Sequence, residues 1–473
     1  MQSVESHYIF YYPFNYRQFH FKELTETLNK NHFYHFRIKQ EKMHEALYGP
    51  DVQINYQLLE QFYFPFIEEK LLNDRVSLVH FNRFSKDIGE TGHMQTKFCN
   101  IKFTLHSADI NLCPFGIGII ALRIQLHDVP DVTTALSFAH FFRVLLPKID
   151  EELGAQLFLG ELPYQHTEQL ILEKIAPFLS YFFIDYQRQK ASASKMPFFE
   201  DERMYVSGFM QVDPTIVLTD ELLYRAGQLN GYDETGAAYI SSTNPDYIRA
   251  FVDEHLYMRW MPDFAIMTTL QSHMQLTTIQ DARLDKYLCN FHSISYYNVL
   301  IHYFYKMMLL KLAFEHSELK FSKDKDIVEE LIEQITKFAS RYYFSEVSVR
   351  TEGKEMAQFF RKTFRIDAQY REIKETLDEL YRIQEDRSTD RLNELIFILT
   401  VFSMISGIYG MNLVIDKLDK PFEFSNVWSF TFFEWVAFLL TIVGLAISIL
   451  LVGNQIRNLL TSYIERKRRA RSQ

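Results

Sequence analysis

Two long apolar segments near the C-terminus constrain this chain more than any other feature of its sequence. The first, LIFILTVFSMISGIYGMN, runs from Leu395 to Asn412 without a charged residue. The second, SFTFFEWVAFLLTIVGLAISILLV, occupies 429–452 and carries a single charge, Glu434. A helix needs about 20 apolar residues to cross the hydrocarbon core of a bilayer. The sequence therefore predicts two transmembrane helices, at 395–412 and 429–452.

Basic residues set the predicted orientation of these helices. The tail 453–473 is rich in Arg and Lys, whereas the loop 413–428 has more acidic than basic residues. Positive charge favours the cytoplasmic side of a membrane. We therefore expect a multi-pass protein of a bacterial-type plasma (inner) membrane, with both termini in the cytoplasm and a short extracellular loop.

Composition excludes several other classes of protein. The net charge of −10 argues against general nucleic-acid binding. Cys99, Cys113 and Cys289 lie far apart without a CxxC pair, so neither a disulfide framework nor a zinc ribbon is expected. Dinucleotide-binding, P-loop, metalloprotease and nucleophile-elbow motifs are absent from the sequence, which predicts that the protein is not an enzyme and takes no organic cofactor.

A long helix is predicted to lead into the first apolar segment, since no Gly or Pro occurs from Lys354 to Ser406. Its apolar residues alternate in steps of four and three between charged flanks, which is typical of a seam that packs against partner helices. The seam consists of Ile366, Tyr370, Ile373, Leu377 and Leu380.

The rest of the chain reads as mixed α and β structure, with strand-like stretches such as HYIFYYPFNY and GIGIIALRIQL. Asp131 is a plausible helix cap, and 294–314 is expected to be a buried helix. The predicted fold class is an α+β cytosolic domain, a long stalk helix and two C-terminal transmembrane helices. The predicted ranges are 1–325 for the α/β domain, 326–394 for the helical region, 395–412 and 429–452 for the spans, 413–428 for the loop and 453–473 for the tail.

Two glycines near the end of the first predicted span affect its backbone conformation. Gly407 and Gly410 let the backbone leave helical geometry, and irregular backbone at membrane depth is tolerated only beside water or inside protein. The carbonyl of Gly410 and the amide of Asn412 could then hold Mg²⁺ through its tightly bound waters. One chain cannot enclose such a hole, so a ring of identical copies is required.

The stripe that leads back from this point carries hydroxyl and aliphatic groups in alternation. It suits a narrow water path, and it suits plain helix packing equally well. Its members are Ser403, Thr400, Ile396, Leu392 and Thr389.

The motif Tyr409-Gly410-Met411-Asn412, with a long helix before it and a short loop, a second apolar segment and a basic tail after it, resembles the CorA-type magnesium channel family. The resemblance implies a homopentameric funnel in membrane lipid, a selectivity filter at Tyr409, Gly410, Met411 and Asn412, and Mg²⁺ as the usual ion, with Co²⁺ or Ni²⁺ as further ions. It also implies acidic sites that sense Mg²⁺. The candidates are Asp326, Glu329, Glu330 and Glu333, for which a solvated helix face is the alternative.

The sequence thus predicts a homo-oligomeric divalent-cation channel for Mg²⁺ uptake, gated by its cytosolic domain. Two alternatives stay open. One is a zinc transporter of the same fold, since the first acid after Asn412 comes only at Asp416. The other is a membrane-anchored binding or signalling module without transport.

Overall fold

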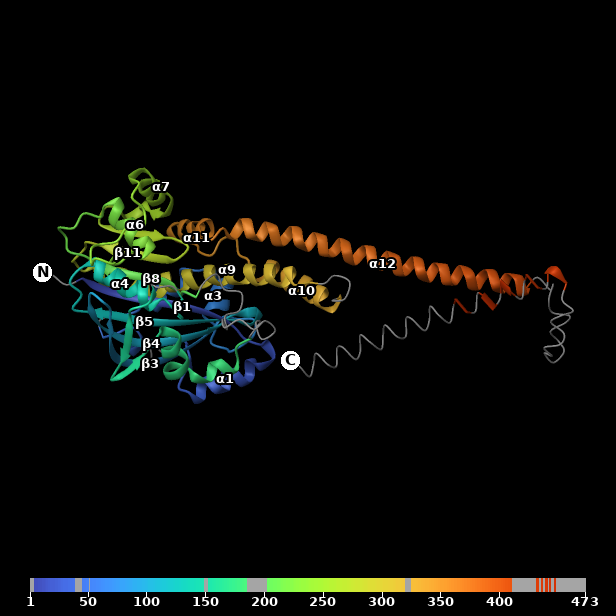
Figure 1. The fold of residues 1–473 in the computed structure, drawn as a ribbon, viewed down its shortest axis with the longest axis horizontal. Helices are drawn as coiled ribbons and strands as arrows, with labels where there is room; N and C mark the ends of the chain where they lie inside the picture. Colours follow the sequence, from blue (N-terminus) through green and yellow to red (C-terminus); the bar gives the residue numbers. More distant parts are fainter. Residues whose placement is uncertain are drawn as a thin grey trace. The chain divides into compact units, whose positions relative to one another are not determined.

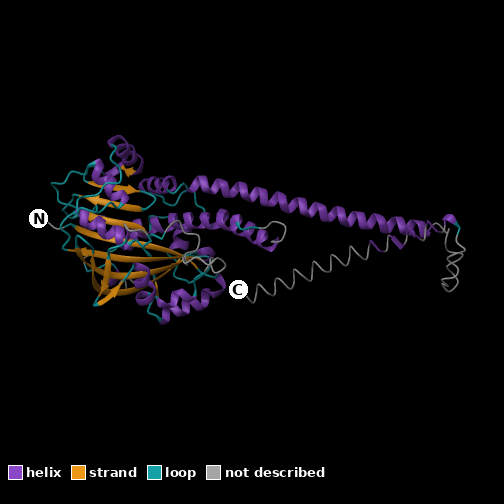
Figure 2. Ribbon diagram, viewed as in Figure 1, coloured by secondary structure: helices purple, strands orange, loops and turns teal. Residues whose placement is uncertain are grey.

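The computed structural model describes residues 4–38, 45–50, 52–148, 152–184, 202–319 and 325–410, together with scattered positions between 431 and 447. The chain divides into two compact units, Met1–Leu377 and Asp378–Gln473. The first unit contains the sheet and all helices up to the first turns of α12. Figure 1 and Figure 2 show the sheet with helices on its faces.

One mixed sheet of eleven strands forms the centre of the first unit. The order is β7-β6-β3-β4-β5-β1-β8-β11-β10-β9, and β2 pairs with β3. Neighbouring strands are antiparallel, except that β8 and β11 are parallel. The strands are β1 (Glu5–Asn15), β2 (Tyr34–His35), β3 (Asn82–Gln95), β4 (Asn100–Leu112), β5 (Ile117–His127), β6 (Gln156–Leu159), β7 (Leu162–Tyr164), β8 (Tyr205–Gln211), β9 (Leu256–Tyr257), β10 (Phe264–Thr268) and β11 (Ser272–Thr277).

Twelve α-helices are found among the described residues, and a π-helix, η9 (Phe291–Ser295), joins α8 to α9. The predicted cap is confirmed, because Asp131 accepts a 2.8 Å hydrogen bond from the backbone N–H of Thr134 in the first turn of α4. The helices are α1 (Phe21–Lys30), α2 (Tyr56–Glu60), α3 (Pro65–Leu71), α4 (Val132–Phe142), α5 (Thr167–Gln169), α6 (Asp220–Gln228), α7 (Pro245–His255), α8 (Arg283–Asn290), α9 (Tyr296–Ser317), α10 (Lys325–Arg341), α11 (Thr351–Thr363) and α12 (Ile366–Gly410).

The two faces of the sheet differ in chemistry. Successive residues of a strand point to opposite faces, so β1 shows both. Phe10 belongs to the large apolar core and packs against Phe142 of α4, with ring centroids 4.6 Å apart. Tyr11 points the other way and stacks on Tyr296 of α9 at 6.0 Å.

The face beneath α9 carries a buried polar row. Ile9 of β1 lies opposite Arg123 of β5 and Ser207 of β8, and Ser207 lies opposite His273 of β11. Paired residues share one face of a sheet, so these polar side chains line up under the covering helices. All are buried. Buried polar groups need hydrogen-bond partners, and this row is where both sites discussed below are built.

The helix α9 is buried, as predicted for 294–314. His302 is 0% exposed and Lys306 is 1% exposed. Lys311 donates a 2.6 Å hydrogen bond to the backbone carbonyl of Phe115. The polar residues that interrupt its apolar sequence therefore lie inside the protein fold.

The prediction of two transmembrane helices is wrong. Along the described residues, no helix combines the length and the apolarity that crossing a bilayer requires. The helix α12 is long, but its uncharged part runs only from Leu395 to Gly410, which is shorter than the roughly 20 residues that a spanning helix needs. The predictions of a CorA-type funnel and of a multi-pass inner-membrane protein both depended on those two helices. The same finding contradicts both predictions.

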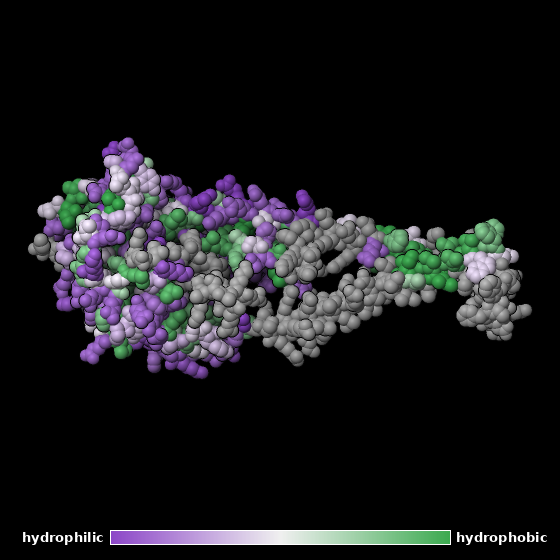
Figure 3. All heavy atoms as spheres, viewed as in Figure 1, coloured by the Kyte–Doolittle hydropathy of each residue, from purple (hydrophilic) through white to green (hydrophobic). Residues whose placement is uncertain are grey.

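The end of α12 nevertheless carries exposed apolar side chains, which Figure 3 shows as a hydrophobic stretch. Leu392 is 56% exposed and Leu399 is 71% exposed. Most of 429–452, the second predicted span, lies outside the described residues.

Candidate functional site

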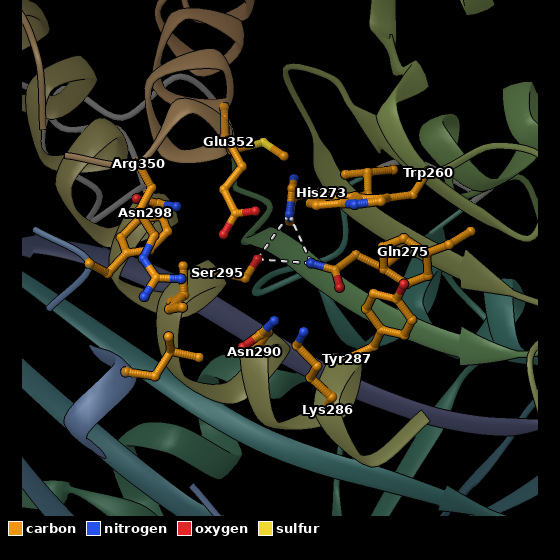
Figure 4. Close-up of a pocket in the computed structure, with 16 residues that line it drawn as sticks. Trp260, His273, Gln275, Lys286, Tyr287, Asn290, Ser295, Asn298, Arg350 and Glu352 are labelled. Carbon is orange, nitrogen blue, oxygen red and sulfur yellow. Dashed lines mark hydrogen bonds between the residues drawn. The ribbon is translucent and has the colours of Figure 1, made fainter. Parts of the chain in front are cut away.

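A cavity of about 240 Å³ opens at the polar face of the sheet, between β10, β11, α8, α9 and the start of α11 (Figure 4). Residues far apart in the sequence meet there because α9 and α11 both cover this face. The lining residues are Leu58, Phe62, Trp260, Phe264, Ile266, His273, Gln275, Lys286, Tyr287, Asn290, Ile294, Ser295, Asn298, Arg350, Glu352 and Met356.

A neutral hydrogen-bonded network forms one side of the cavity. His273 Nδ1 lies 2.9 Å from Thr268 Oγ1, and His273 Nε2 lies 3.0 Å from Ser295 Oγ. The amide nitrogen of Gln275 lies 2.9 Å from Ser295 Oγ and 3.1 Å from His273 Nε2. An amide nitrogen can only donate, so His273 Nε2 is the acceptor and Nδ1 carries the proton. Burial lowers the pKa of His273 to about 3, so the imidazole is neutral at pH 7.

Aromatic rings form a second side of the cavity. Phe264 and Tyr287 stack with their centroids 4.4 Å apart, and Trp260 meets Phe264 nearly edge-on at 5.8 Å. Such a wall offers a ligand a flat apolar surface with the negative face of its π-systems.

Three charged side chains complete the lining, Lys286 from α8 and Arg350 and Glu352 from the start of α11. Figure 4 shows the amine of Lys286 and the carboxylate of Glu352 pointing into the open space. In the part of the chain that the structure describes, none of the three forms an ion pair. Unpaired charges that converge on a cavity are available to a ligand.

The start of α11 approaches the cavity closely because residue 353 is glycine. A Cβ atom there would lie 2.3 Å from Ser348 Oγ and 2.7 Å from the ring of Phe62. Ser348 in turn donates a 2.5 Å hydrogen bond to the carbonyl of Phe62. Gly353 therefore lets the first turn of α11 carry Arg350 and Glu352 to the cavity.

One acceptor at the cavity has no partner within the described chain. The side-chain oxygen of Asn290 is buried without a hydrogen bond. By contrast, the side-chain oxygen of Asn298 accepts a 3.2 Å hydrogen bond from Tyr63. A buried acceptor left open costs free energy unless a ligand or water donates to it.

The predicted filter lies at the edge of what the structure describes. Tyr409 and Gly410 are the last residues of α12, and Met411 and Asn412 lie outside the described residues. The five stripe residues are all on α12 and exposed: Thr389, Leu392, Ile396, Thr400 and Ser403. Thr400 donates a 2.7 Å hydrogen bond to the carbonyl of Ile396 in its own helix. Both assignments stay predictions.

The predicted acidic site, Asp326, Glu329, Glu330 and Glu333, lies on α10. Glu333 is paired with Lys337 at 2.5 Å, and Glu330 accepts a 3.5 Å hydrogen bond from Gln334. Over the described ranges, no group of three or more His, Cys, Asp or Glu residues is arranged to hold a metal ion. A regulatory role for these acids stays a prediction.

The cavity was missed by sequence reasoning because its residues come from many elements that lie far apart in the sequence. One local signal was present. In SHMQLT, residues 272–277, polar His273 and Gln275 alternate with apolar residues although the whole strand is buried. A buried strand with a polar face indicates a polar layer beneath it.

Comparison with known proteins does not assign a function to this cavity. No protein-family model matches the sequence, and the curated proteins contain no match to it. The magnesium-transport description drawn from the YGMN motif therefore gains no support from relatives, and the function has to be argued from the described residues.

Proposed function

We propose that this chain is a ligand-binding module that recognises a small zwitterion with one flat ring, such as an aromatic amino acid, and makes or breaks no bond in it. The single observation that carries the proposal is the convergence on an aromatic-walled cavity of Lys286, Arg350 and Glu352, which have no ion-pair partner among the described residues. Ligand sites typically combine an apolar wall with a few converging polar groups.

The lining dictates the chemistry of the ligand. Arg350 and Lys286 suit a carboxylate, since charged donors make the stronger hydrogen bonds. Glu352 suits an ammonium group, and the rings of Trp260 and Tyr287 suit a flat apolar body. The cavity of about 240 Å³ accommodates a single-ring molecule rather than a dinucleotide.

The helix α11 connects the cavity to α12. Its first residues carry Glu352, and its last turn carries Arg361, which donates a 2.7 Å hydrogen bond to the carbonyl of Phe344 and is paired with Asp367 in the first turn of α12. Although burial raises it, hydrogen bonds from Arg361 and Tyr343 bring the pKa of Asp367 below its ordinary value, so this carboxylate stays charged. A ligand that draws Arg350 and Glu352 inward would therefore move the helix that holds α12.

We expect Arg350→Gln to weaken binding of a single-ring amino acid at least tenfold. A hydrogen bond to a charged group contributes about 1.5–3 kcal/mol, which corresponds to that loss. Calorimetric titration of the purified chain with phenylalanine, tyrosine and benzoate measures it. Arg249→Gln is the matched control, because Arg249 lies on α7 and is 3.6 Å from Asp220, away from the cavity. If none of these probes binds, or if both variants bind equally, the proposal is wrong.

Divalent-cation transport is a second candidate, and it rests on the sequence Tyr409-Gly410-Met411-Asn412 and on the resemblance that this motif carries. One structural observation favours it: α12 runs without a break from Ile366 to Gly410, so the motif begins in the last turn of a long helix. In this candidate several copies of the chain assemble, and the amides at Asn412 hold Mg²⁺ with its hydration water.

For this second candidate, Asn412→Ala should abolish Mg²⁺ flux by the reconstituted full chain, because the alanine side chain cannot hydrogen-bond to a hydrated ion. Flux of Mg²⁺, Co²⁺ and Zn²⁺ is measured side by side, with Asn454→Ala as the control amide. Absence of Mg²⁺ flux by the wild type would refute transport, and unchanged flux in the Asn412 variant would refute the role of its amide. Neither outcome affects the cavity proposal.

A further inference from the structure

A buried cluster of charge lies on the polar face of the sheet, away from the cavity. Asp109 of β4 is paired with Arg83 of β3 at 3.1 Å and also with Arg123 of β5. Ser85 donates a 2.7 Å hydrogen bond to the same carboxylate. Arg123 and Asp109 are 0% exposed, and Arg83 is 4% exposed.

The charges in this cluster do not balance. Two guanidinium groups face a single carboxylate, and the other polar groups beside them are serine hydroxyls, phenols and imidazoles. Burial raises the pKa of Tyr296, and it raises the pKa of Tyr297 to about 12, so both phenols are neutral. Burial also lowers the pKa of His292, so that imidazole is neutral too. The cluster holds one uncompensated positive charge.

Two hydrogen-bond donors of Arg123 also lack an acceptor. Among the described residues, Nε and Nη2 of Arg123 are buried without a partner. The hydroxyls of Tyr11 and Ser207 are buried and hydrogen-bonded to each other, so one hydroxyl hydrogen of this pair is left to donate elsewhere. The register of the sheet places these groups together. Ile9 lies between Arg123 and Ser207, and Tyr11 is the next residue of β1 on the same face. The guanidinium also lies over the rings of Tyr296 and Tyr48, at 4.5 and 5.1 Å from their centroids.

We propose that one halide-sized anion is bound beside Arg123, where it neutralises the cluster and accepts hydrogen bonds from Arg123 and from one hydroxyl of the Tyr11–Ser207 pair. A buried charge without a counter-charge destabilises a fold by several kcal/mol, and cation–π contacts recover only a part of that. A monoatomic anion is the smallest group that supplies the missing negative charge. Chloride is the abundant anion of this class.

Crystals of the full chain grown in bromide provide the first test. We expect an anomalous difference peak within hydrogen-bond distance of the Arg123 guanidinium and of one hydroxyl of the Tyr11–Ser207 pair. Ordered water without anomalous signal at that place would overturn the proposal.

Thermal unfolding at constant ionic strength provides the second test. Replacement of gluconate by chloride should raise the Tm of the wild type by about 2 °C or more for each tenfold increase in chloride. Arg123→Met removes the surplus charge and should remove this dependence. Arg225→Met is the matched control, since Arg225 is buried but is hydrogen-bonded to the carbonyls of Tyr239, Asn230 and Gly231. That control should lower the Tm and keep the chloride dependence. Equal Tm values in both salts for the wild type would overturn the proposal, even if Arg123→Met does not fold.

Discussion

Asp109→Asn should lower the free energy of unfolding by about 3–5 kcal/mol, the usual cost of leaving a buried charge unpaired. The variant keeps the shape of the side chain but leaves Arg83 and Arg123 side by side without a carboxylate. Although burial raises it, Arg123 and Arg83 lower the pKa of Asp109 below its ordinary value, so the carboxylate is charged in the folded state. Urea unfolding at pH 7 measures the loss.

Two comparisons make this result specific. Arg123→Met should cost less than Asp109→Asn, because it leaves a neutral pair of Arg83 and Asp109 at 3.1 Å. Asp213→Asn, at an exposed turn where the side chain accepts from the backbone of Thr215, should leave the urea midpoint close to that of the wild type. If Arg123→Met lowers the free energy of unfolding more than Asp109→Asn does, the balance of charges does not decide the stability of this cluster.

Local features of the fold could be predicted from the sequence because local physics decides them. The aromatic and aliphatic stretch around Tyr8–Phe14 forms β1, and the cap at Asp131 starts α4. The absence of Gly and Pro after Lys354 predicted one long helix. The structure breaks it between α11 and α12, where Arg365 has a φ of 54°, and α12 then continues to Gly410. Each of these depends on neighbours within a few residues.

The arrangement of these elements could not be predicted, since it depends on contacts between distant residues. The parallel pairing of β8 with β11 joins residues more than sixty positions apart in the sequence, such as Ser207 and His273. The apolar seam predicted to need partner helices gives a second example. Ile366 and Ile373 are buried within this chain, and Tyr370 stacks on Tyr343 at 3.8 Å. Periodicity predicts an apolar face, but it does not say what covers that face.

The transmembrane prediction rested on the uncharged length of Leu395–Asn412. The uncharged part of α12 ends at Gly410, and along the described residues no helix is long and apolar enough to cross a bilayer. For the cavity, the only local signal in the sequence was the alternation of polar and apolar residues along β11.

The stability of the fold should fall steeply as the pH is lowered from about 6.5 toward 4. Burial lowers the pKa of His273 to about 3 and that of His302 to about 4, whereas an unfolded histidine titrates near 6.5. Between these pH values the two histidines are protonated in the unfolded state but stay neutral in the folded state. The free energy of unfolding therefore decreases as the pH falls, by about 1.4 kcal/mol per pH unit for each of the two histidines. Above pH 7 neither histidine is protonated in either state, so both cease to contribute.

Unfolding by urea at pH 7.5, 6.0, 5.0 and 4.5 measures this slope. His273→Gln should reduce the slope by about 1.4 kcal/mol per pH unit, because one of the two histidines that bind a proton only in the unfolded state is removed. His32→Gln, at an exposed position, should leave the slope as in the wild type. The pairing of Asp109 acts in a different window: the pKa of this carboxyl is lowered, so its stabilising effect is lost only as the pH falls below about 4. A wild-type stability that stays constant from pH 7.5 to 4.5 would show that His273 and His302 are not buried as neutral imidazoles.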